Sequence, residues 1–135
     1  MNSQPTVVGV GNALLDETYE LTNLPDPDGG AYVLNCVDRL GGVETNVCVL
    51  IHSLGTTSGI IARVGADSKG SNVLSRLDEL DIDARRVRQI DGDITSYCLV
   101  LTEPNGERMI IGGGDSTLNL ELNDADLKYI EAAKV

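Results

Sequence analysis

Residues 40–55 read LGGVETNVCVLIHSLG, a glycine pair followed by an apolar run that a further glycine closes. Within this run, apolar side chains recur at the spacing of one helix face: Val43, Val47, Leu50, Ile51 and Leu54. The spacing predicts a helix that is packed on more than one side and that Gly55 ends. Because the glycine pair carries no side chains, the start of this helix is a place where a ligand can approach the backbone.

A strand and a second helix are predicted after the first helix. The strand covers residues 57–64, and Asp67 or Ser68 can cap a helix over about residues 69–80. Apolar residues of this second helix fall on one inner face: Val73, Leu74, Leu77 and Leu80.

The chain begins with a short β-branched run over residues 6–10, which predicts a first buried strand closed by Gly11. Gly9 and Gly11 after a strand suggest a dinucleotide-binding loop, but Leu14 stands in place of the third glycine and no helix pattern follows. Asp16, expected at the end of this strand, is placed to accept hydrogen bonds from a polar ligand. The alternative is a solvated aspartate in a turn.

Three further strands are predicted outside the strand and helix units. Residues 31–37 follow the turn-rich segment 24–30 and are expected to start a new layer. Residues 94–102 and 107–111 form a hairpin, because the Asn-Gly turn signal lies between them. Residues 82–87 are a weaker candidate for a strand.

Two features that resemble binding motifs have simpler interpretations. Arg85, Arg86 and Arg88 are expected to pair with neighbouring carboxylates, since charge runs are usually solvated faces. The segment 112–115, Gly-Gly-Gly-Asp, is predicted to be a flexible hinge, because neither Gly-Lys-Ser/Thr nor a helix follows it.

The last predicted helix begins after Asn123, with Asp126 at the third position and Leu127 and Ile130 on its inner face. His52, the lone histidine, is expected to be a satisfied side chain within the first helix. No metal-ligand cluster and no set of nucleophile, base and orienting group can be read from the sequence.

The composition restricts the class of protein. The 135 residues are enough for one domain with a core, and a net charge of −11 makes nucleic acid and anionic membranes poor partners. With no long apolar run and no signal segment, we expect a soluble cytoplasmic protein. The acidic surface and the scarcity of lysine favour a halophilic origin.

The three cysteines, Cys36, Cys48 and Cys98, are widely spaced and contain no Cys-x-x-Cys pair. This pattern predicts reduced, mostly buried thiols rather than a disulfide framework or a zinc site.

In their order and spacing, the motifs resemble the ribokinase-like (PfkB-type) sugar and nucleoside kinases. The matching segments are residues 11–16 (GNALLD), 25–30 before a lid strand, 40–55 with Asn46, 63–70 (RVGADSKG) and 104–108 (PNGER). The resemblance covers the whole chain, residues 1–135, but only the N-terminal part of the family's single domain.

The resemblance implies an α/β fold, with a parallel sheet flanked by helices and a small β-sheet lid built from about residues 31–38 and 94–111. It implies ATP-dependent phosphorylation of a sugar hydroxyl, with ATP and Mg²⁺ as cofactors, and a possible homodimer formed through the lid. The family's catalytic base lies in a Gly-Ala-Gly-Asp segment that this sequence does not contain. The chain is therefore expected to be an inactive fragment that supplies the substrate-binding half and the lid.

Carried over residue by residue, the resemblance implies that Asp16 and Asn46 bind substrate hydroxyls and that Gly41 and Gly42 let the substrate lie against the backbone. A carboxylate and an amide around a glycine platform suit a neutral, hydroxyl-rich ligand. Asn12 and, more weakly, Tyr97 on a lid strand are further candidates for substrate binding.

Two residues depart from the sugar-kinase pattern and keep the substrate open. Val43 and Leu14 stand where some sugar kinases of the family carry polar side chains, and GNALLD is closer to the adenosine-kinase branch. The alternatives to a sugar kinase are a nucleoside kinase and a half-domain that binds a small ligand or a partner without catalysis.

Overall fold

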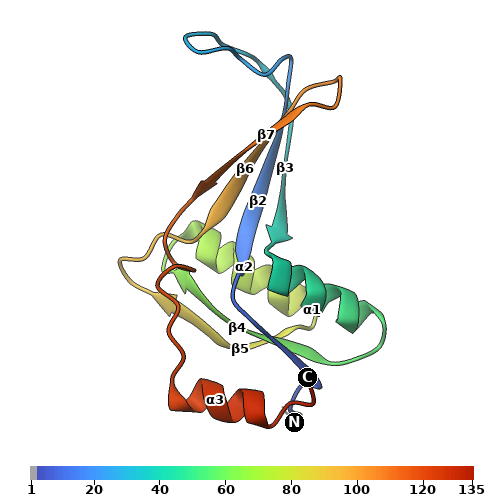
Figure 1. Ribbon diagram of the computed structural model, residues 1–135, viewed down its shortest axis with the longest axis vertical. Coiled ribbons are helices and arrows are strands. Elements are labelled where there is room, and N and C mark those ends of the chain that lie inside the picture. Colours follow the sequence, from blue (N-terminus) through green and yellow to red (C-terminus); the bar gives the residue numbers. More distant parts are fainter. Residues whose placement is uncertain (1–2) are drawn as a thin grey trace.

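The computed structural model describes residues 3–135 of the chain (Figure 1). Its elements follow in the order β1 (Val7–Val10), β2 (Leu14–Leu21), β3 (Val33–Gly41), α1 (Val43–Ser53), β4 (Ser58–Gly65), α2 (Ser68–Glu79), β5 (Asp83–Ile90), β6 (Tyr97–Thr102), β7 (Arg108–Gly113) and α3 (Asp124–Glu131). No helix among the described residues is long and apolar enough to span a membrane.

Three strands form a parallel sheet in the order β1-β4-β5. Helices α1 and α2 lie on one side of this sheet and α3 lies on the other (Figure 1). Alternate residues of β4 serve the two faces, as the period of a strand requires. Ile60, Ala62 and Val64 enter the main core, whereas Gly59 lies against the hydroxyl group of Tyr129 from α3.

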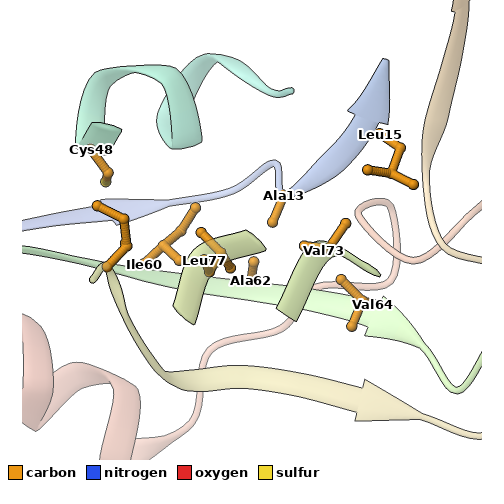
Figure 2. Packing of buried hydrophobic residues seen from close by; sticks show 9 residues of the cluster. Ala13, Leu15, Cys48, Ile60, Ala62, Val64, Val73 and Leu77 are labelled. Atoms are coloured by element: carbon orange, nitrogen blue, oxygen red, sulfur yellow. The ribbon is translucent and has the colours of Figure 1, made fainter. Parts of the chain in front are cut away.

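The core is packed between the parallel sheet and the two helices on its first side. Figure 2 shows β4 side chains meeting Val73 and Leu77 of α2, with Cys48 of α1 nearby. This confirms Val73 and Leu77 as the inner face of α2. Leu80 is 41% exposed and lies just beyond the helix, so its assignment to that face was wrong.

The lid is a separate mixed sheet in the order β3-β2-β6-β7, which stands away from the parallel sheet (Figure 1). Strand β2 was not predicted, and it carries Asp16 in the lid rather than at the end of the first strand. Its sequence, LLDETYEL, has polar residues on both faces, so the period-2 alternation that reveals a strand is missing. The register runs Asp16 to Arg39 on β3 and to Cys98 on β6.

Helix α1 forms where predicted, but its apolar stripe does not face the core. Val43, Val47, Leu50 and Leu54 are 71%, 47%, 60% and 76% exposed, and the buried residues are Thr45 and Cys48. The physical reason is a close approach to β1. A Cβ on Gly9 would lie 2.8 Å from the Cys48 sulfur, so only small side chains fit between helix and strand.

Strand β1 also accepts a second neighbour on its other edge. The Val135 amide donates to the Thr6 carbonyl at 3.1 Å, and the Val8 amide donates to the Val135 carbonyl at 2.9 Å. Val135 thus forms hydrogen bonds with the residues before and after Val7. This is the hydrogen-bond pattern of a parallel strand pair.

Helix α3 begins with the predicted cap. The side chain of Asn123 accepts from the Asp126 amide, and that of Asp126 accepts from the Asn123 amide, which makes a capping box. The inner residues are Asp126 and Tyr129, whereas Leu127 is 47% exposed, so the prediction for Leu127 was wrong. The sequence pattern favoured apolar contacts, but an ion pair occupies this face.

The arginines of β5 pair with carboxylates, as predicted. Arg86 and Arg88 both bind the fully buried carboxylate of Asp126, at 2.6 and 2.5 Å, and Arg85 binds Asp83 at 3.0 Å. Burial raises the pKa of Asp126, but hydrogen bonds from Arg88, the Asn123 amide and Arg86 outweigh it and hold the pKa below its ordinary value. This triad fixes α3 on β5.

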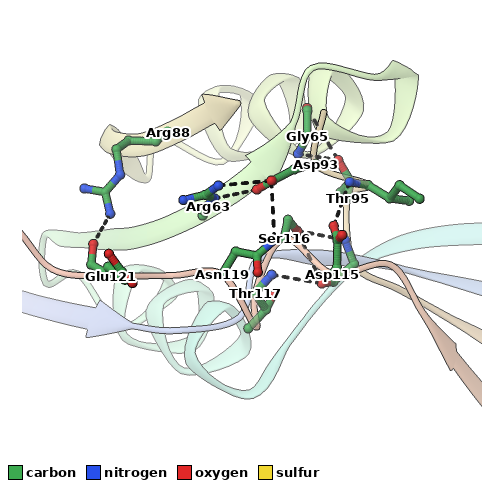
Figure 3. Close-up of polar contacts among 12 residues, drawn as sticks. Arg63, Gly65, Arg88, Asp93, Thr95, Asp115, Ser116, Thr117, Asn119 and Glu121 are labelled. Atoms are coloured by element: carbon green, nitrogen blue, oxygen red, sulfur yellow. Dashed lines mark hydrogen bonds and ion pairs between the residues drawn. The ribbon is translucent and has the colours of Figure 1, made fainter. Parts of the chain in front are cut away.

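The segment after β7 is bound along the ends of β4 and β5 by polar contacts (Figure 3). Arg88 of β5 donates to the Glu121 carbonyl at 2.5 Å, and Asn119 donates to Asp93, which pairs with Arg63 of β4. Gly112 and Gly113 belong to β7, so the predicted hinge is reduced to Gly114, whose φ is 79°.

The cysteines and the histidine differ from expectation. All three thiols are free, but only Cys48 is buried; Cys98 is partly buried and Cys36 is exposed on β3. His52 was expected to be satisfied, yet its buried Nδ1 has no hydrogen-bond partner among the described residues.

Candidate substrate-binding site

The candidate site lies where the first strand of the parallel sheet passes into the lid. Strand β1 ends at Val10, β2 begins at Leu14, and the end of β3 at Gly41 leads directly into α1. In open parallel α/β sheets, ligands bind outside the carboxyl ends of the strands. The topology therefore brings Asn12, Asp16 and the glycine pair to the edge at which such a site is expected.

At position 41, only glycine leaves room for the Asp16 carboxylate in its observed position. A Cβ on Gly41 would lie 2.4 Å from Asp16 Oδ2 and 2.5 Å from its Cγ, far inside van der Waals contact. The carboxylate thus lies directly against the backbone of the glycine pair. This supports the interpretation of the glycines as a platform that admits close approach.

Gly42 has a different requirement. Its φ of 107° is in the region that favours glycine, and a Cβ there would lie 2.5 Å from the Asn12 carbonyl oxygen. As the N-cap of α1, Gly42 offers no side chain to the first-turn amides. No N-cap side chain therefore covers the first-turn amides of α1, at the end of a helix that favours oxygen-bearing ligands.

Two residues of the first turn of α1 hold the backbone of Asn12. The Asn12 amide donates to Glu44 at 2.9 Å, and the Thr45 hydroxyl donates to the Asn12 carbonyl at 2.6 Å. Burial raises the pKa of Glu44, but the hydrogen bonds from the amides of Asn12 and Glu44 outweigh it, and the pKa falls below its ordinary value. Sequence reasoning missed both residues, although a polar pair at the start of an apolar helix was a visible signal.

Asn46 lies one helical turn after Gly42, and its amide donates to the Gly42 carbonyl at 2.9 Å. It is exposed, and it lines a hollow of about 310 Å³ between α1 and α2 together with Leu40 and Arg76. Asp16 does not line that hollow. The structure thus brings Asp16 against Gly41 and Asn12 against Gly42, whereas the Asn46 side chain lines the separate hollow between α1 and α2.

Asp16 belongs to the face of the lid that is turned away from α2. Side chains of register partners point to the same side of a sheet, so Asp16 shares its face with Arg39 and Cys98. A hollow of about 360 Å³ lies further along this face, and polar residues dominate its lining: Thr18, Glu20, Asn35, Val37, Arg39, Thr102, Glu103 and Pro104.

Tyr97 lies on the other face of the lid. It is the register partner of Leu15, next to Asp16 on β2, and successive residues of a strand alternate between faces. Its ring packs on Gly113 of β7 and lies 4.8 Å from Lys69 Nζ of α2. The structure therefore separates Tyr97 from Asp16, and Cys98 takes the place beside the carboxylate.

Cys98 is the lid residue that sequence reasoning missed. Burial raises the pKa of its thiol, and the negative charge of nearby Asp16 raises it further. The thiol is thus kept protonated next to the carboxylate. Only the parallel pairing of β2 with β6 reveals this contact, and β2 was not foreseen.

The chain matches the family described as "pfkB family carbohydrate kinase" over residues 6–135. It is 27% identical over 106 residues to an ATP-dependent ribose-1-phosphate kinase of Halopiger xanaduensis, covering 78% of this chain and 36% of that protein. It is 35% identical over 108 residues to a fructokinase of Klebsiella pneumoniae, covering 80% and 34% of the two chains.

The solved structures give the same fold. Ribokinase of Arabidopsis thaliana, complexed with ribose and ATP, superposes with a TM-score of 0.85 at 23% identity, covering 97% of this chain and 44% of that one. A nucleoside kinase of Methanocaldococcus jannaschii superposes with a TM-score of 0.72 at 24% identity, covering 80% and 36%. The parallel sheet flanked by helices and the small lid sheet are therefore ribokinase-like, as expected.

The chain spans about a third of the length of the curated relatives that it matches. The match nevertheless includes β1, the lid strands, the glycine pair and all three helices. The chain belongs to the pfkB family of carbohydrate kinases.

Proposed function

We propose that this chain is the substrate-binding and lid portion of an ATP-dependent kinase that phosphorylates a sugar hydroxyl. The observation that carries the proposal is the contact of the Asp16 carboxylate with the bare backbone of Gly41, next to the uncapped start of α1. A carboxylate accepts hydrogen bonds from hydroxyls, and free backbone amides donate to their oxygens. A neutral polyol supplies both kinds of group.

In this proposal, Asp16 orients the substrate by accepting from its hydroxyls, and Asn46 binds another hydroxyl from the first turns of α1. Asn12 contributes mainly through its backbone, which Glu44 and Thr45 hold against Gly42. Cys98 and Arg39 flank Asp16 on the lid face that would cover the substrate. Tyr97 packs against α2 and has no part in substrate contact.

The described residues do not fit a nucleotide or a magnesium site. They contain no group of three or more His, Cys, Asp or Glu side chains that could hold a metal ion. Gly112 and Gly113 are paired in β7, and the amides of Asp115 and Ser116 donate to the Ile94 carbonyl, so this glycine-rich segment is not free to bind phosphates. We propose that ATP and Mg²⁺ bind residues of a longer protein, and that this chain alone does not transfer phosphate.

The exposed stripe of α1 is consistent with such a longer protein. Val43, Val47, Leu50 and Leu54 make a continuous apolar surface on one helix. The relatives are more than twice as long as the segment they share with this chain. We propose that further residues of the kinase cover this stripe.

A second copy of the chain is the proposed partner of the lid. On the face opposite Asp16, the register aligns Cys36, Tyr19, Leu101 and Met109 in one row, and the neighbouring Ile111 is 45% exposed. Pairing of two lids would cover this row. We expect Met109→Glu to convert a dimer into a monomer in sedimentation velocity; a parent chain that is monomeric at all concentrations would contradict the proposal.

Isothermal titration of the chain with ribose, fructose and adenosine tests the function. We expect a sugar to bind, and Asp16→Asn to weaken that binding roughly 10- to 150-fold, since a hydrogen bond to a charged group is worth about 1.5–3 kcal/mol. Asp124→Asn, an exposed carboxylate on α3, is the matched control and should bind like the parent.

The same titration separates the alternatives. Binding of adenosine without binding of either sugar would favour a nucleoside kinase. This chain is 25% identical over 100 residues to the nucleoside kinase of Methanocaldococcus jannaschii. Equal affinity of the parent and Asp16→Asn would remove Asp16 from the site. In a protein of full family length, ATP turnover dependent on the sugar would exclude the binding-only half-domain.

A further inference from the structure

Helix α2 presents a polar stripe to the lid. Lys69, Asn72 and Arg76 recur at the spacing of one helix face, and all three reach toward the lid strands β2 and β3. Lys69 pairs with Glu17 of β2. The Arg76 guanidinium donates twice to Asp38 of β3: to the Asp38 carboxylate at 2.9 Å and to the Asp38 backbone carbonyl at 3.0 Å.

Asn72 completes the contact between helix and lid. Its amide nitrogen donates to Asp38 Oδ2 at 3.2 Å, and its amide oxygen accepts from Arg76 Nε at 2.6 Å. The Arg76 guanidinium is thus held in place by its own helix while it binds the strand. Such pre-organisation reduces the side-chain entropy lost in forming the ion pair.

The two carboxylates that α2 binds are neighbours in the lid. Glu17 and Asp38 are direct register partners of the antiparallel pair β2 and β3. Like charges placed directly opposite each other destabilise a sheet. Each carboxylate has its own cation on α2, so contact with this helix offsets the repulsion between the two carboxylates and stabilises the lid in this position.

Lys69 extends the contact to a third lid strand. Its ammonium lies 4.8 Å from the centroid of the Tyr97 ring on β6, a cation–π geometry. The ring in turn packs on Gly113 of β7. One helix face therefore contacts three strands of the lid directly and the fourth through Tyr97.

The chain crosses between the parallel sheet and the lid four times. Each crossing contains a glycine with positive φ: Gly11, Gly42, Gly92 and Gly114. Such residues are common where the backbone must turn sharply, and hinges form at the ends of elements. The lid is thus joined to the rest of the molecule through turns. At its base, Leu15 of β2 enters the main core, and beyond that point the polar side chains of α2 tie β2 and β3 to the helical layer.

We propose that Lys69, Asn72 and Arg76 form a latch: by binding the Glu17–Asp38 pair, they fix the orientation of the lid relative to α2 and the parallel sheet. The latch acts on the face of the lid opposite Asp16, one residue away along β2, and Asp38 is one residue from Arg39 along β3. Lys69, Asn72 and Arg76 are therefore positioning residues for the lid face that carries Asp16. This inference concerns the orientation of the lid and holds whether or not the proposed kinase function is correct.

Distance measurement between two spin labels tests the latch in the full 135-residue chain. One label is placed at the exposed lid turn with Glu107→Cys, and the other on α3 with Glu131→Cys. Cys36 and Cys98 are changed to serine, whereas Cys48 is buried and stays. The double variant Lys69→Gln/Arg76→Gln should broaden the distance distribution and raise its minor population roughly 2- to 30-fold, as expected for two partly exposed ion pairs.

Arg85→Gln is the matched control, because Arg85 forms an ion pair of the same kind with Asp83 but does not touch the lid. Its distance distribution should match that of the parent. Arg76→Asp places a third carboxylate against the pair and should broaden the distribution further, and the swap Arg76→Asp/Asp38→Arg should restore it. An unchanged distribution in Lys69→Gln/Arg76→Gln overturns the latch. Should that variant fail to fold, a folded swap variant whose distribution stays broad overturns it as well.

Discussion

Gly41→Ala places a methyl group where the carboxylate of Asp16 now lies. The new Cβ would be 2.4 and 2.8 Å from the two carboxylate oxygens and 2.5 Å from Cγ. Ordinary contacts of a Cβ begin near 3.4 Å, so the carboxylate must move by about 1 Å. Gly41 has no positive φ, so alanine causes no backbone strain there.

The magnitudes separate a binding effect from a folding effect. Turning one partly exposed side chain off its rotamer costs about 0.5–1.5 kcal/mol, which is the expected loss in the free energy of unfolding. Misplacing a charged hydrogen-bond acceptor costs about 1.5–3 kcal/mol of ligand binding, or roughly 10- to 150-fold in affinity. Urea unfolding measures the first quantity, and calorimetric titration with the sugar measures the second.

Gly30→Ala is the control, because a Cβ on Gly30 would have no atom within 4 Å. It should change neither stability nor affinity. A folded Gly41→Ala chain that binds the sugar like the parent would refute the reasoning, since the carboxylate would then have moved without consequence. A decrease of several kcal/mol in the free energy of unfolding would also refute the reasoning, because it would show that Gly41 is needed for packing rather than for the site.

Three further predictions concern charge and thiol chemistry. Asp126→Ala leaves two arginines without their buried partner, and it should lower the free energy of unfolding by on the order of 3 kcal/mol in urea denaturation; a loss below 1 kcal/mol would contradict the triad. The pKa values of Asp126 and Asp67 are lowered in the folded chain from 3.8, so the stability they contribute is present above about pH 4 and is lost as pH falls through the lowered values. Thermal unfolding from pH 6 to pH 2 should show that loss, and a midpoint that rises on acidification would contradict it. In the native chain, iodoacetamide should modify exposed Cys36 first and buried Cys48 last, with Cys98 between them because its thiol pKa is raised; mass spectrometry of timed samples reads the order, and early modification of Cys48 would contradict the packing of α1.

The sequence allowed the parallel unit to be predicted because its signals are local. The cap at Asp67 and the inner face of Val73 and Leu77 determine α2, and the Asn123–Asp126 capping box determines the start of α3. The paired arginines of β5 also follow from composition, since the chain has 21 acidic residues against 10 basic ones.

Strand β2 and the orientation of α1 could not be predicted in the same way. β2 has polar residues on both faces because one face meets the cations of α2 while the other carries Asp16. α1 has an apolar stripe directed away from its own sheet, so periodicity identified the helix but assigned the wrong face. Both failures arise because tertiary contacts, rather than local pattern, decide which side of an element is buried.

The candidate site was predicted in part for a related reason. The resemblance to the ribokinase-like kinases identified Asn12, Asp16 and the glycine pair, and the structure brings Asp16 against Gly41 and Asn12 against Gly42. Cys98 could not be found, because its position beside Asp16 depends on the parallel pairing of two strands that are far apart in sequence. Tyr97, its neighbour, was chosen instead, and a shift of one residue along a strand changes the face.

Amide chemical shifts measured during titration of the labelled chain with ribose test the central claim most directly. If the sugar lies between Asp16 and the glycine pair, the largest shifts will be those of Asn12, Asp16, Gly41, Gly42 and Asn46, and they will disappear in Asp16→Ala. Shifts that are absent from these amides, or that persist unchanged in Asp16→Ala, would contradict the claim that this segment binds the acceptor of the phosphoryl transfer.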